Sequence, residues 1–147
     1  MVTIAIVGVL SAIAAPALTS MIRMQRVKSA TFDLYAAVTY ARSEAIKRNA
    51  VVTITPRTGG FANGYDLAAG GLVLRSQLGR PAVTIAAPGG VAAPAFAFDG
   101  FGRLTSSALY KLQLTPAALI PLSGSTPDRC LVIGPSGRPS ISVGVCP

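Results

Sequence analysis

The first 22 residues contain no charged side chain and are mostly apolar. As a helix rising about 1.5 Å per residue, this stretch would be about 33 Å long, close to the ~30 Å thickness of a bilayer's hydrocarbon core. We therefore predict a transmembrane helix over residues 1–22, kinked at Pro16, which cannot donate a backbone hydrogen bond. Two alternatives stay open. A cleaved signal peptide normally has a basic residue before its apolar run, and none is present; a helix buried in a soluble domain is rarely apolar all round over this length.

The same helix is predicted to continue to about Asn49. A short basic segment follows the apolar run, and from Val27 onward small and apolar residues recur every three or four positions. This spacing predicts one buried helical face, and we assign residues 23–50 as the amphipathic half of the helix. The residues of this face are Val27, Ala30, Leu34, Val38, Ala41 and Ala45.

Residues 51–147 change character and are predicted to form a β-sheet domain. Short runs of β-branched and apolar residues alternate with segments rich in Gly and Pro, as expected for antiparallel strands joined by turns. The predicted strands are 51–55, 65–68, 72–75, 82–86, 95–98, 110–115, 130–133 and 140–145. We therefore expect an α+β fold in which a long N-terminal helix packs on an antiparallel sheet.

The side chains that usually carry catalysis are scarce. The sequence has no His, and its five carboxylates, at positions 33, 44, 66, 99 and 128, are scattered singly. Gly100-Phe101-Gly102 begins like a nucleotide-binding loop, but Arg103 and Leu104 follow in place of the rest of that pattern. We expect no enzymatic activity, no cofactor and no metal. The net charge of +8 favours polyanions as partners, although a merely solvated basic surface is an equal alternative.

The two cysteines, Cys130 and Cys146, lie close to the C-terminus. Without His or further Cys they cannot complete a zinc site with four ligands. We expect a disulfide, worth about 3 kcal/mol for a loop of this size, and therefore an oxidising compartment. Two unrelated buried thiols in a cytosolic domain remain the alternative, and the basic segment at residues 23–28 would also place the domain in the cytoplasm by the positive-inside rule.

The predicted disulfide would close a C-terminal hairpin at its open end, with strands 130–133 and 141–146 and a tip at 134–139. Arg138 would project from this tip between a Gly and a Pro, and Arg129 would lie at the base of the hairpin. A guanidinium that is already held in place loses little entropy on binding, which suits phosphate recognition. The alternative is that Arg138 is simply a solvated turn residue.

Several of these segments resemble one protein family. They are the apolar start with Pro16, the helix from Asp33 to Asn49 containing Ala41-Arg42-Ser43-Glu44-Ala45, the strand from Val51, the stretch from Phe98 to Arg103, and the ending from Cys130 through Gly137-Arg138-Pro139 to Cys146. Together they resemble the type IV pilin-like proteins of the GspH/FimT group, and the C-terminal segments resemble its FimT branch.

The resemblance implies a minor pilin or pseudopilin of the bacterial inner membrane, with its globular part in the periplasm and other pilin subunits as partners. FimT-like pilins are associated with DNA uptake in natural transformation, through a Gly-Arg-x-Arg motif near the C-terminus. Gly137 and Arg138 match the first two positions of the motif, and Ser140 replaces its second Arg. We expect non-specific phosphate contacts by Arg138, supported by Arg129, Lys111 and Arg103. The alternative is a structural GspH-like pseudopilin of type II secretion, or a pilus-priming subunit, without DNA binding.

Pilins of this group begin with a basic leader, a Gly before the cleavage site and then Phe-Thr-Leu-Ile-Glu, and this block is missing before Met1. We expect a start assigned too late, at an in-frame Met. Prepilin peptidase would be a partner only if the true N-terminus lies upstream, and the leader would then supply the cytoplasmic positive charge.

Overall fold

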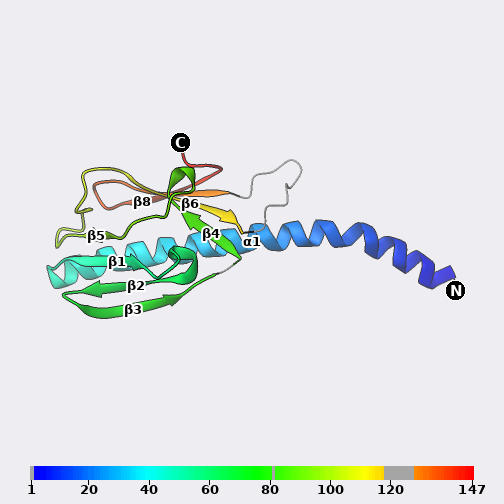
Figure 1. Cartoon of the computed structure of the whole chain (residues 1–147), viewed down its shortest axis with the longest axis horizontal. Coiled ribbons are helices and arrows are strands. Elements are labelled where there is room, and N and C mark those ends of the chain that lie inside the picture. The colour runs from blue at the N-terminus through cyan, green and yellow to red at the C-terminus, as the bar shows by residue number, and fades with distance from the viewer. Residues whose placement is uncertain (1, 81, 118–127) are drawn as a thin grey trace.

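The computed structural model describes residues 2–80, 82–117 and 128–147, with side chains described from Leu18 onward. The chain begins with one helix, α1 (Val2–Arg48), which continues through Pro16 as a single element. Figure 1 shows that its N-terminal part projects well beyond the strands. Asn49 follows with a φ of 47°, the left-handed conformation common just after a helix. The long helix is thus confirmed, while the kink at Pro16 stays a prediction.

The predicted transmembrane half depends mainly on side chains that lie outside the described residues. Its last members, Leu18, Met21 and Ile22, are exposed in the isolated chain. In the part of the chain that the structure describes, no helix combines the length and apolarity that a membrane crossing requires.

Within the described residues, eight strands follow the helix, and each of the predicted strands is present within one or a few residues of its predicted bounds. They are β1 (Val52–Pro56), β2 (Gly64–Ala69), β3 (Leu72–Leu78), β4 (Val83–Ala86), β5 (Phe96–Phe98), β6 (Tyr110–Pro116), β7 (Arg129–Ile133) and β8 (Pro139–Val143). Two 3₁₀ turns, η1 (Phe61–Asn63) and η2 (Pro88–Gly90), lie in the connections.

The strands form two antiparallel sheets of four strands rather than one sheet. Sheet A has the order β3-β2-β1-β5, and sheet B has the order β4-β6-β7-β8. Figure 1 shows β2 and β3 below the helix and β8 above it. The division could not be predicted because β1 pairs with β5 and β4 pairs with β6, so each sheet joins strands that are not consecutive.

The core lies between the C-terminal half of α1 and the two sheets. The helix contacts β1 and β5 of sheet A and all four strands of sheet B. Every residue of the predicted buried face of the helix is buried, with at most 3% of its surface exposed. Small Ala side chains on this face let the strands come close to the helix.

The C-terminal end of α1 carries a buried carboxylate, Glu44, which is 7% exposed. Arg48 Nε donates a hydrogen bond to its Oε2 at 2.6 Å, and Lys47 Nζ lies 3.7 Å from Oε1. The hydrogen bond from Arg48 is the main reason why the pKa of Glu44 lies below its ordinary value. Arg48 and Lys47 therefore keep the buried carboxylate of Glu44 charged near the C-terminal end of α1.

Candidate nucleic-acid interface

Two loops meet at the end of the molecule that lies farthest from the N-terminus; we call residues 99–104 and 134–138 the distal tip (Figure 1). Leu104 N–H donates to the Pro135 carbonyl at 3.1 Å. Gly137 has a φ of 74°, and a Cβ atom built on it would lie 2.0 Å from the Gly102 carbonyl oxygen. Only glycine fits at this crossing, which explains why a Gly precedes Arg138.

The loop before the crossing is held by its own hydrogen bonds. Asp99 Oδ1 accepts the backbone N–H groups of Phe101 at 3.0 Å and Arg103 at 2.9 Å. The backbone N–H of Asp99 donates to the Arg103 carbonyl at 2.9 Å, which closes the turn. Gly100-Phe101-Gly102, which begins like a nucleotide-binding loop, thus forms a turn held by hydrogen bonds. The Cα atoms that carry its side chains therefore have defined positions.

Helix α1 supports both loops through Arg42, a residue that the sequence analysis did not single out. Arg42 Nε donates to the Gly102 carbonyl at 2.9 Å and lies 3.1 Å from the Cβ position of Gly137. A Cβ on Gly102 would meet Ile46 Cδ1 at 2.6 Å, so this loop rests directly on the last turns of the helix. One feature of the sequence could have indicated this role: Arg42 follows the buried Ala41 and therefore lies at the margin of the predicted apolar face of the helix.

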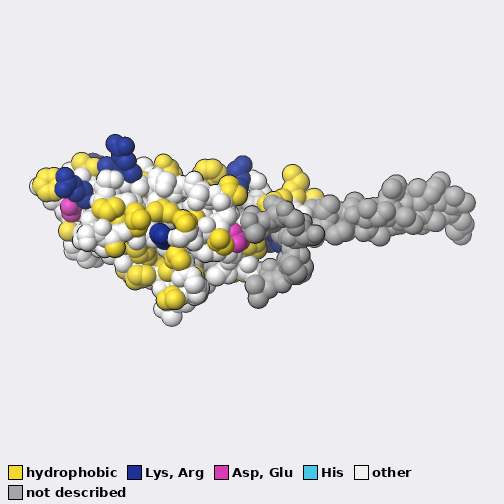
Figure 2. Space-filling model, turned by 90° about the horizontal axis from the view of Figure 1, so that it is seen from above, with side chains coloured by type: hydrophobic (Ala, Val, Ile, Leu, Met, Phe, Trp, Pro, Cys, Tyr) yellow, Lys and Arg dark blue, Asp and Glu magenta, His cyan; other side chains and the backbone are white. Residues whose placement is uncertain are grey.

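Two of the four predicted DNA-binding residues, Arg103 and Arg138, lie on the distal tip and are exposed. Each is adjacent in sequence to one of the two crossing glycines, Gly102 and Gly137, so their backbones lie close together. Figure 2 shows basic side chains at this end of the molecule, beside an acidic and a hydrophobic one. The tip also carries the carboxylate of Asp99, and the guanidinium of Arg42 reaches it from α1.

Neither of these two arginines is neutralised by an ion pair within the described residues. The ion pairs found there join Lys47 and Arg48 to Glu44, Arg57 to Asp66, and Arg80 to Asp33. The hydrogen bonds from Arg57 are the main reason why the pKa of Asp66 is lowered. The charge of Arg103 and Arg138 is therefore available to a ligand.

The other two predicted residues lie elsewhere. Arg129 is the first residue of β7 and pairs with Val143, four positions and about 13 Å along the hairpin from its tip. Lys111 is on β6, opposite Val132, and its Nζ donates to the backbone oxygen of Pro147. The structure therefore brings together Arg103 and Arg138, and leaves Arg129 and Lys111 outside the tip.

The predicted disulfide is present between Cys130 and Cys146, with Cα atoms 5.0 Å apart. The predicted strand 141–146 is wrong at its end, because β8 stops at Val143. Cys130 lies opposite Ser142 in the hairpin, so a strand that continued straight would carry Cys146 away from it. Gly144, with a φ of 103°, lets the chain turn back and bring the cysteines together.

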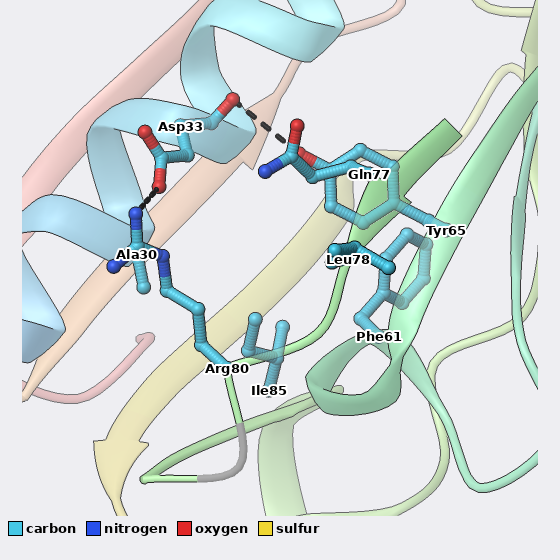
Figure 3. Close-up of a pocket in the computed structure, with 8 residues that line it drawn as sticks. All are labelled: Ala30, Asp33, Phe61, Tyr65, Gln77, Leu78, Arg80 and Ile85. Carbon is cyan, nitrogen blue, oxygen red and sulfur yellow. Dashed lines mark hydrogen bonds and ion pairs between the residues drawn. The ribbon is translucent and has the colours of Figure 1, made fainter. Parts of the chain in front are cut away.

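A small cavity between α1 and the β3–β4 segment offers a second candidate site (Figure 3). Its volume is about 20 Å³, which is room for one water and no organic ligand. Arg80 reaches across it to Asp33 at 2.5 Å. Burial raises the pKa of Tyr65 to about 12, so its hydroxyl stays protonated and donates to the Asp33 carbonyl at 3.4 Å. The contacts of Asp33 with Arg80 and Tyr65 connect α1 to the sheets across this cavity. The residues that line it are Ala30, Asp33, Phe61, Tyr65, Gln77, Leu78, Arg80 and Ile85.

Residues 30–137 match the family model described as type II transport protein GspH. The chain belongs to this family. The matched region contains the amphipathic half of α1 from Ala30 onward, both sheets except β8, and the distal tip up to Gly137. Arg138 and Cys146 lie beyond its end.

Solved structures support the same fold. Two crystal forms of FimU, a type IV minor pilin of Pseudomonas aeruginosa, each superpose with a TM-score of 0.64. The alignments have 22% and 23% identity, and they cover 78% and 82% of this chain and 91% and 89% of the FimU chain. The α+β pilin-like fold is therefore confirmed. A search of curated proteins finds no match.

Proposed function

We propose that this GspH-family chain is a FimT-like minor subunit of a type IV pilus or pseudopilus that binds DNA without sequence preference during natural transformation. The observation that carries the proposal is the pair of exposed arginines, Arg103 and Arg138, whose backbones the glycine crossing holds side by side. Contacts from guanidinium groups to phosphates read no base sequence, which suits the uptake of arbitrary DNA.

The shape of the molecule supports this role. Helix α1 has 47 residues, about 70 Å at 1.5 Å per residue, and the tip lies at its C-terminal end. In our proposal the N-terminal half lies in the inner membrane or among neighbouring pilin subunits, and the globular part lies in the periplasm. The disulfide is consistent with that oxidising compartment. The tip is then the part presented to the exterior.

The test is a titration of short duplex DNA with the full chain in a non-ionic detergent, at a low and a higher salt concentration. We expect binding that weakens steeply with salt, with a logarithmic slope near −0.9 per phosphate contacted. Arg138→Ala should weaken binding several-fold and make the slope shallower by about 1.

The matched control is Arg75→Ala, which removes the same charge from exposed strand β3, where Arg75 lies over the ring of Tyr40 at 5.8 Å. It should leave DNA affinity nearly unchanged. Equal binding by the wild type and Arg138→Ala, or no binding at low salt, would contradict the proposal.

A second candidate function is a structural GspH-like pseudopilin of type II secretion or a pilus-priming subunit, and the family match to type II transport protein GspH favours it. In that role the basic tip would contact a neighbouring subunit. Absence of DNA binding in the titration above would leave this function as the better one.

A further inference from the structure

The distal tip carries an aromatic ring that neither the core nor the proposed phosphate contacts use. Phe101 is 79% exposed, whereas Phe61, Phe96 and Phe98 are buried. An apolar ring left in water on a well-ordered turn gains nothing for folding. Its position leaves the ring free to contact a ligand.

The ring is presented from a fixed place. The backbone N–H of Phe101 donates to Asp99 Oδ1 at 3.0 Å, and that of Gly102 donates to the Asp99 carbonyl at 2.9 Å. Only the two side-chain torsions of Phe101 remain to be ordered on binding, and an aromatic side chain with two torsions loses little entropy.

The ring also has cations close to it in the fold. Arg103 is two residues away in the same turn, and Arg138 follows Gly137, whose Cβ position would lie 2.0 Å from the Gly102 carbonyl oxygen. The two guanidinium groups and the ring thus all start within one residue of the same glycine crossing. Figure 2 shows hydrophobic and basic side chains next to each other at this end of the molecule.

We infer that Phe101 is a base-stacking platform and that the distal tip binds single-stranded nucleic acid, or unpaired ends, in preference to intact duplex. A flat exposed ring beside cations is the combination that binds single strands, since the ring stacks on a base while the cations hold the flanking phosphates. In a duplex the bases are already stacked on one another, so their faces are not available to the ring. The inference rests on the proposed function, and it specifies single-stranded nucleic acid as the preferred ligand of the site.

The sequence allows a direct reporter, because it contains no Trp. Phe101→Trp places a single indole fluorophore on the platform, and Phe32→Trp, at a side chain 54% exposed on α1, is its matched control. Addition of oligothymidylate to the full chain in detergent should strongly quench the fluorescence of the Phe101→Trp variant and leave that of the control unchanged. Duplex DNA of equal length should quench the Phe101→Trp variant much less. An oligouridylate arm shows whether the site distinguishes DNA from RNA.

Affinity measurements complete the test. Phe101→Ala should lower the affinity for oligothymidylate by about fivefold to a hundredfold, the range expected for one stacked base, and change duplex affinity by less than about twofold. Phe101→Leu, which keeps an apolar side chain but no ring, should lose the same affinity. Arg138→Ala should weaken both ligands.

The outcomes separate the two proposals. If Arg138→Ala weakens binding but Phe101→Ala leaves single-strand affinity unchanged, or lowers single-strand and duplex affinity equally, the stacking inference is overturned and the phosphate-binding tip stands. If the wild type binds neither ligand at low salt, both proposals fail. Unchanged circular dichroism of each variant shows that lost binding is not lost folding.

Discussion

At the scale of single residues, the glycines of the distal tip decide where the charged side chains lie. Gly137 has no room for a Cβ, since one would lie 2.0 Å from the Gly102 carbonyl. Gly144, beyond the tip, also has a positive φ, 103°, but among the described residues other than its chain neighbours no atom lies within 4 Å of its Cβ position. Substitution of each glycine by Ala therefore distinguishes the free-energy cost of the backbone conformation, which applies at both positions, from the cost of a steric clash, which applies only at Gly137.

We predict that Gly137→Ala destabilises the fold more than Gly144→Ala does. Each substitution places Ala in a backbone conformation that costs about 1–3 kcal/mol. Gly137→Ala should cost a further ~1–3 kcal/mol, because the crossing loops must move apart. Chemical denaturation of both variants, with the disulfide intact, measures the difference. Equal destabilisation by the two variants would show that the crossing is looser than the contact distances indicate.

At the scale of elements, the end of α1 joins a charged network to a packed helix. Glu44 is buried and is held by Arg48 and Lys47. The same helical turns carry Arg42 and Ile46, which support the loop of the distal tip. Protonation of Glu44 should therefore lower the stability of the helical turns that position the distal tip.

We predict that Glu44→Gln is less stable than the wild type at neutral pH and that the difference vanishes in acid. The pKa of Glu44 is lowered in the folded state from its ordinary value of 4.5, chiefly by the hydrogen bond from Arg48. A lowered folded pKa means that the stabilisation is complete above about pH 5 and is lost as the pH falls through the folded value. Thermal unfolding of both proteins across this range measures it.

Comparison of the two proteins at each pH cancels the parallel titration of Asp66, whose pKa is also lowered. A stability difference that stays constant down to pH values where all carboxyl groups are protonated would assign the effect of Glu44→Gln to packing rather than to charge.

At the scale of the whole molecule, α1 is the element shared by both sheets. It contacts β1 and β5 of sheet A and every strand of sheet B. Leu34 and Val38 on its buried face are at most 1% exposed. Each sheet packs against the same helix, and the buried apolar residues that the structure describes form one shared core.

We predict that the two sheets unfold together and that Leu34→Ala lowers the stability of both by about 2–5 kcal/mol. Fluorotyrosine observed by ¹⁹F NMR reports on sheet A through Tyr65 and on sheet B through Tyr110. The two signals should share one denaturation midpoint, which shifts equally in Leu34→Ala. Phe32→Ala, on the exposed face of the same helix, is the control and should shift the midpoint little. Two separate midpoints would show that the sheets are independent units.

The sequence alone determined the elements of this protein. The helical spacing from Val27 to Ala45 and the β-branched runs between Gly and Pro predicted α1 and the eight strands, because both patterns depend on residues close together in the chain. The disulfide was predictable for a similar reason, since only two cysteines are present and they lie near each other. The family resemblance pointed to Gly137 and Arg138.

The tertiary structure alone decided how these parts combine. Division into two sheets follows from pairings between distant strands, such as β1 with β5, whose energies no local pattern encodes. The distal tip depends on Arg42, Gly102 and Gly137, which meet only after the helix, the loop and the hairpin have packed. Arg129, expected at the base of the hairpin, and Lys111 were grouped with Arg138 as supporting charges, and strand register places both away from it. Contacts between residues far apart in sequence form only when the whole chain has folded, so the composition of the candidate site is a property of the fold.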